Sequence, residues 1–66
     1  MKLHELEVGK LYFKVKGDPE VIYKIDRDKD GELYLWYRHK ASPRMYLEEI
    51  TIALIKEDFE ECSTLL

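Results

Sequence analysis

The chain has 66 residues and a formal net charge of −3, and its composition is 45% hydrophobic, 38% charged and 12% aromatic. This length predicts one small domain, residues 1–66, of modest stability, and the composition is too apolar for a disordered chain. A single cysteine, Cys62, excludes an intramolecular disulfide and favours a reducing compartment. The chain shows neither a signal-peptide pattern nor an apolar run that could span a bilayer, so we expect a cytoplasmic protein with no membrane contact.

The charges are distributed unevenly along the chain. Residues 10–44 hold nine Lys and Arg against six Asp and Glu, whereas residues 45–66 hold one Lys against six Asp and Glu. A mildly basic body with an acidic end could steer a partner or another copy of the chain. The alternative is ordinary solubilising charge.

Three segments between residues 10 and 40 alternate apolar and polar side chains, which is the signature of β-strands. They span residues 10–16, 21–26 and 32–40. Glycine, aspartate and proline at 17–20 predict the first turn, and the Asp-Gly pair at the end of 28–31 predicts a hairpin turn because it tolerates positive φ. The sequence therefore predicts an antiparallel β-meander.

Residues 45–55 fit two structures. Ser42 and Pro43 resemble a helix start, and Leu47, Ile50 and Leu54 have helical spacing. However, the segment is rich in β-branched residues, which favour a strand. We prefer a fourth strand, followed by one helical turn at 56–59 and a short last strand at 60–63. The alternative is an α+β fold, in which a three-stranded meander precedes a helix at about 43–61.

The preferred arrangement, about five antiparallel strands with a one-turn helix before the last, matches a small SH3-like barrel, in which closure hides exposed sheet edges. Val8-Gly9-Lys10-Leu11-Tyr12, Tyr23-Lys24-Ile25 and Asp58-Phe59-Glu60 resemble a pattern in small SH3-like proteins of phages and bacterial mobile elements. The resemblance covers most of the chain but supplies no catalytic or binding residues. It implies an accessory protein that modulates a larger machine.

The motifs that could carry chemistry are incomplete. Asp26 to Gly31 reads D-x-D-x-D-G, the first half of a calcium loop, but Tyr37 stands where the bidentate glutamate belongs. His4, His39 and Cys62 lack the close spacing of a zinc site, and a Cys–His nucleophile pair would need an orienting group and a pocket. We therefore expect no metal, no cofactor and no enzymatic activity.

A binding face is the stronger signal. If the nine alternating apolar residues from Leu11 to Tyr37 fill the interior, their neighbours form one outer patch of aromatic and basic side chains. Such patches are typical of interaction sites. Two alternatives remain: a shifted register that buries Trp36, or a second segment that covers the patch. The predicted partner-binding residues are Tyr12, Lys14, Ile22, Lys24, Tyr34, Trp36 and Arg38.

Three functions follow from this face. The first is a protein–protein interaction module, whose partner is a larger host protein or a second copy of the chain. The second is nucleic-acid binding, in which aromatic rings stack on bases and cations neutralise phosphates; the negative net charge argues against it. The third is a structural subunit of a complex.

Overall fold

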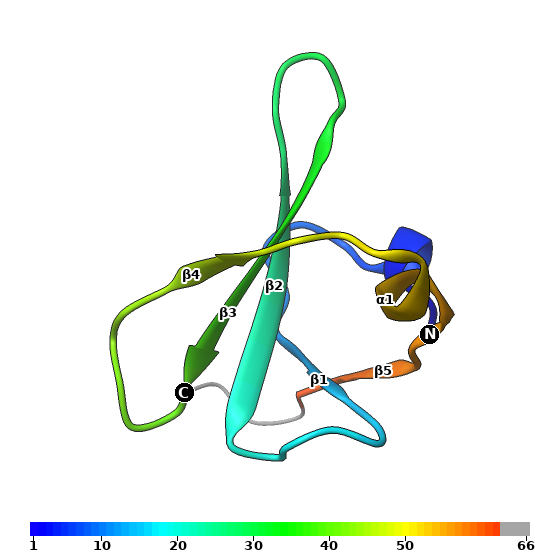
Figure 1. Cartoon of the computed structure of the whole chain (residues 1–66). Helices are drawn as coiled ribbons and strands as arrows, with labels where there is room; N and C mark the ends of the chain where they lie inside the picture. Colours follow the sequence, from blue (N-terminus) through cyan, green and yellow to red (C-terminus); the bar gives the residue numbers. More distant parts are fainter. Residues whose placement is uncertain (63–66) are drawn as a thin grey trace.

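The structure is a computed structural model that describes residues 1–62, and it consists mainly of one five-stranded antiparallel sheet. The strand order is β4-β3-β2-β1-β5, so β4 and β5 form opposite edges of an open sheet (Figure 1). Two short helices, η1 (Leu3–Glu5) and α1 (Ile52–Lys56), contact each other beside the sheet. The strands are β1 (Tyr12–Lys14), β2 (Val21–Arg27), β3 (Leu33–His39), β4 (Tyr46–Glu48) and β5 (Phe59–Glu61).

The all-β class is confirmed, and the α+β alternative with a helix over 43–61 is wrong. Residues 45–55 contain both elements that the sequence left open, with β4 first and then α1. The helix begins after Thr51, whose Oγ1 accepts a hydrogen bond from the Leu54 N–H at 3.2 Å. It therefore starts four residues before the predicted turn at 56–59 and overlaps that turn only at Lys56. The last strand starts at Phe59 instead of 60; Ser63, the end of the predicted strand, lies outside the described residues.

The β2–β3 hairpin is the longest paired segment, and its prediction is confirmed. Seven residue pairs join the strands, from Val21 opposite His39 to Arg27 opposite Leu33. Gly31 closes the turn at φ +81°, a conformation that glycine adopts without steric cost. The Asp28 carbonyl accepts the Gly31 N–H at 2.9 Å. This arrangement is a three-residue hairpin loop that ends in a left-handed glycine.

The Asp28 carboxylate stabilises this turn. One of its oxygens accepts the backbone N–H groups of Asp30 and Glu32, each at 2.9 Å. Hydrogen bonds from Glu32, and to a smaller extent from Asp30, lower the pKa of Asp28, because they favour the ionised carboxylate.

Asp28→Ala is expected to destabilise the protein at neutral pH and to have progressively less effect as the pH falls. A carboxyl whose pKa is lower in the folded state contributes stability above its unfolded pKa. That contribution is lost as the pH drops through the folded pKa. Thermal unfolding of both proteins between neutral and strongly acidic pH measures this convergence. A constant difference in melting temperature across the range would show that the charge of Asp28 plays no part.

The core covers one side of the sheet, called here the inner face. Eight buried residues form one cluster, with Val21, Leu33 and Tyr37 packed partly against it. Leu35 is fully buried at its centre, and the two helices supply its cover. The cluster consists of Leu3, Leu6, Tyr12, Tyr23, Ile25, Leu35, Leu54 and Phe59.

The predicted orientation of the first strand is wrong. Tyr12 is only 1% exposed and belongs to the core, whereas Leu11 and Phe13 are half-buried and Val15 is exposed. Leu11, Tyr12 and Phe13 are consecutive apolar residues, so alternation cannot show which of them faces inward. The hydroxyl of Tyr12 accepts the Glu7 N–H at 2.9 Å, which satisfies the one polar atom of the buried ring.

Lys14 shares the face of Tyr12, because strand residues two apart point to the same side. Its ammonium lies 5.1 Å from the centroid of the Tyr23 ring, a cation–π geometry. Lys14 is thus on the inner side of the sheet, and its predicted place in an outer patch is also wrong.

The edge strand β5 is extended by backbone pairing with the first residue. The Met1 ammonium donates to the Phe59 carbonyl at 2.8 Å, and the Phe59 N–H donates to the Met1 carbonyl at 2.6 Å. Lys2 forms an ion pair with Asp58 at 3.0 Å. Within residues 1–62, no helix is long and apolar enough to cross a membrane.

Candidate functional site

The side of the sheet opposite the core, called here the outer face, carries the candidate site. The register of β2, β3 and β4 aligns its residues in rows across the strands, with Lys24 opposite Trp36 and Trp36 opposite Leu47. Cross-strand neighbours of this kind lie about 5 Å apart, so they form one continuous surface. Its residues are Ile22, Lys24, Asp26, Tyr34, Trp36, Arg38 and Leu47, with Met45 beside them.

Four of the predicted partner-binding residues meet on this face: Lys24, Tyr34, Trp36 and Arg38. Lys24, Trp36 and Arg38 are partly exposed, and Tyr34 is exposed. Ile22 lies on the same side but is 1% exposed, so its side chain is not available to a partner. Ile22 is not a member of the main core cluster. Trp36 is neither a core residue nor fully exposed.

Trp36 borders a shallow hollow of about 280 Å³ that it shares with Lys24, Asp26 and Met45. This volume is at the lower limit for small-molecule pockets, which span roughly 300–1,000 Å³. Asp26 makes the face less basic than the sequence predicted, since it lies beside Lys24 on the same strand face.

Met45 and Leu47 were missed as site residues in the sequence. Leu47 is 54% exposed and enters the face because β4 pairs with β3. The sequence did contain an indication of their position, since an alternating strand at 45–49 would place Met45 and Leu47 on the same side of the sheet. The ambiguity between strand and helix in this segment prevented its use.

Tyr34 is held at the hairpin end of the face. Its hydroxyl donates to the second carboxylate oxygen of Asp28 at 3.2 Å. The negative charge of Asp28 raises the pKa of Tyr34, because ionisation would place two negative charges side by side. The ring is thus anchored to the turn as a neutral phenol.

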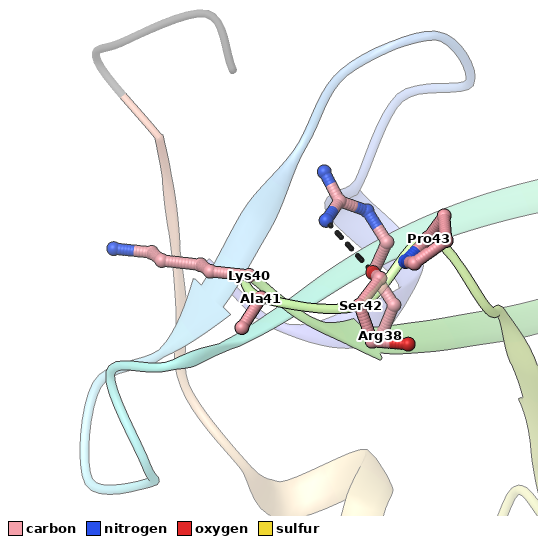
Figure 2. A pocket seen from close by; sticks show the side chains of 5 residues that line it. All are labelled: Arg38, Lys40, Ala41, Ser42 and Pro43. Atoms are coloured by element: carbon pink, nitrogen blue, oxygen red, sulfur yellow. Dashed lines mark hydrogen bonds between the residues drawn. The ribbon is translucent and has the colours of Figure 1, made fainter.

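Arg38 lies at the opposite end of the face, where it supports the loop between β3 and β4. Its Nη1 donates to the carbonyls of His39 at 3.2 Å and Ser42 at 3.3 Å. The side chains of Arg38 and Lys40 border a second hollow but point in different directions (Figure 2). Because these two cations do not converge, the hollow does not have the geometry of a phosphate site.

The motifs considered for metal binding and nucleophilic chemistry can be located in the structure. Within residues 1–62, no three His, Cys, Asp or Glu side chains are grouped so that they could hold a metal ion. In the calcium-like segment, Asp28 already accepts backbone hydrogen bonds within the turn. Burial raises the pKa of the Cys62 thiol, which lowers the thiolate fraction that a nucleophile needs.

The geometry therefore consists of a central half-buried tryptophan, flanking cations and an exposed apolar rim. Comparison of the chain with protein-family models, with curated proteins and with solved structures finds no match.

Proposed function

We propose that this protein is a non-enzymatic interaction module that docks on a larger protein through the outer face of its sheet. The observation that carries the proposal is the position of Trp36, which lies between Lys24 and Leu47 in one cross-strand row. Tryptophan, tyrosine and arginine are the residues that most often dominate binding energy. Here Tyr34 and Arg38 flank Trp36 along β3.

A protein partner fits the face better than nucleic acid. Lys14 lies on the inner side of the sheet, so the outer face has one cation fewer than predicted. Asp26 adds an anion to that face beside Lys24. Nucleic-acid affinity depends on the sum of phosphate contacts, whereas the exposed apolar surface of Leu47 contributes to protein docking. The net charge of −3 also opposes a polyanionic ligand.

The accessory-protein role is part of this proposal. Two features support an SH3-like relationship: β5 pairs with β1 at one end of the meander, and a short helix immediately precedes β5. A small protein of this type acts by occupying the surface of a host enzyme or regulatory factor in the cytoplasm. The lone cysteine is consistent with that compartment.

Trp36→Ala is expected to abolish capture of the partner while the sheet remains folded. The side chain is partly exposed and lies outside the core cluster, so its removal costs less stability than a core truncation. The measurement is affinity capture from the native host with the wild-type protein and the variant. Circular dichroism confirms the fold, and Ile52→Ala, at a 74% exposed site on α1, is the matched control.

Salt dependence tests the class of partner. Docking through aromatic and apolar side chains should change little with ionic strength, whereas binding to nucleic acid should fall steeply. Submicromolar binding of a random single-stranded oligonucleotide at physiological salt would overturn the proposal, as would unchanged capture by the Trp36→Ala variant.

A further inference from the structure

The edge strand β4 presents an unpaired backbone edge with an exposed apolar side chain on each face. Within residues 1–62, β4 pairs with β3 alone, whereas the opposite edge strand is bonded to Met1. Tyr46 is 47% and Leu47 is 54% exposed, and they point to opposite faces. Unpaired strand edges are templates for pairing with another chain.

A row of aromatic rings crosses the inner face and ends at this edge. Ring centroids are 5.7 Å apart between Phe59 and Tyr23, 6.2 Å between Tyr23 and Tyr37, and 5.6 Å between Tyr37 and Tyr46. Each ring lies on a different strand, and contacts of this geometry are favourable. Tyr46 is the exposed end of the row, and a further aromatic ring at the edge would continue it.

The charged residues on either side of Tyr46 would match those of a second copy related by a two-fold rotation, because a positive charge on one side faces a negative charge on the other. Arg44 precedes Tyr46 by two residues and Glu48 follows it by two, and neither forms an ion pair within the described chain. Antiparallel pairing of two copies about Tyr46 places the two Tyr46 rings opposite each other. The same register places Arg44 of each copy opposite Glu48 of the other.

The neighbouring symmetric register, centred on Leu47, lacks both the tyrosine–tyrosine contact and the Arg44–Glu48 pairs. Pairing about Leu47 places Tyr46 opposite Glu48 and Arg44 opposite Ile50, so neither the aromatic row nor the charges continue. Opposite charges across strands favour pairing. Both features therefore select the register centred on Tyr46.

We propose that β4 is a self-association seam, at which a second copy of this chain adds its own β4 antiparallel about Tyr46 and joins the two sheets into one of ten strands. The seam is isologous, because the same edge serves both copies. The proposal does not rest on the proposed docking function, although this register places Met45 of each copy opposite Leu47 of the other at the edge of the outer face.

Analytical ultracentrifugation of the full chain over a concentration series tests the seam, with a reversible monomer–dimer equilibrium as the expected result. Arg44→Glu and Glu48→Arg each create two like-charged pairs, and we expect each to weaken dimerisation about tenfold or more, from the usual size of exposed pair energies. An equimolar mixture of the two variants should restore association, because both cross-strand pairs of the mixed dimer then join opposite charges, one with the native roles and one with the roles reversed. Lys16→Glu, a charge reversal at an exposed site remote from β4, is the control.

The wild-type protein provides a measurement that does not depend on variant folding. In a sample mixed from labelled and unlabelled chains, isotope-filtered nuclear Overhauser effects should connect the two Tyr46 rings. A chain that stays monomeric at millimolar concentration would overturn the proposal. A dimer without the Tyr46 contact, or one equally stable in folded Arg44→Glu and Glu48→Arg variants, would overturn it too.

Discussion

Phe59→Ala is expected to lower the free energy of unfolding by about 3–5 kcal/mol, the range for removal of a buried aromatic ring. Phe59 is 1% exposed and meets the edge of the Tyr23 ring at a centroid distance of 5.7 Å. It also lies on β5, whose pairing with β1 is the longest-range strand contact of the sheet. A core of this size rarely supplies more than about 3–5 kcal/mol, so this one change should leave much of the chain unfolded.

Urea unfolding followed by circular dichroism measures the effect. Ile52→Ala is the control, because Ile52 is 74% exposed in α1 and alanine has the higher helix propensity. We expect that change to be within about 0.5 kcal/mol of the wild type, as for other surface substitutions. Equal effects of the two substitutions would show that Phe59 is not a core residue.

The central hairpin could be predicted because its local signals agree. Residues 21–27 and 33–39 alternate clearly, and the Asp-Gly pair in the turn between them is a strong hairpin signal. Lys24, Tyr34, Trp36 and Arg38 all lie on this hairpin. Their common face follows from the pairing register alone, so alternation together with the hairpin turn was enough to predict that these four residues share one side of the sheet.

The secondary structure of the segment that follows β3, residues 46–56, could not be predicted from periodicity. A three-residue strand and a five-residue helix occupy eleven residues, and neither is long enough to establish a period of 2 or 3.6. The strongest local feature is Thr51, whose side chain caps α1. Ser42 had been interpreted as the cap, but its Oγ accepts the Arg44 N–H within a loop.

The orientation of β1 depends on contacts that are distant in sequence. It pairs with β5, with Lys14 opposite Phe59, and this places Tyr12 and Lys14 on the core side. Three consecutive apolar residues at 11–13 allow either orientation. The two predicted partner-binding residues that lie on the inner face, Tyr12 and Lys14, therefore come from the one strand whose register is set by the far end of the chain.

Tyr12→Ala is the direct test of this orientation, and it should cost about 3–5 kcal/mol because it empties a ring-sized volume in the core. Tyr12→Phe keeps the ring and removes only the acceptor of the Glu7 N–H. Its expected cost is about 0.5–1.5 kcal/mol, the net value of one hydrogen bond. The difference between the two variants isolates the packing contribution of the ring, measured by the same urea transitions.

Tyr34→Ala is the matched control, because it removes an exposed tyrosine from the opposite face of the same sheet. Tyr34 is 36% exposed, against 1% for Tyr12, and its hydrogen bond to Asp28 is exposed, so we expect a clearly smaller loss of about 1 kcal/mol. If Tyr12 faced solvent, as the predicted outer patch requires, Tyr12→Ala and Tyr34→Ala would have similar small effects. A large loss at Tyr12 alone means that β1 turns its tyrosine toward the helices, which leaves Lys24, Tyr34, Trp36 and Arg38 as the aromatic and basic residues available to a partner.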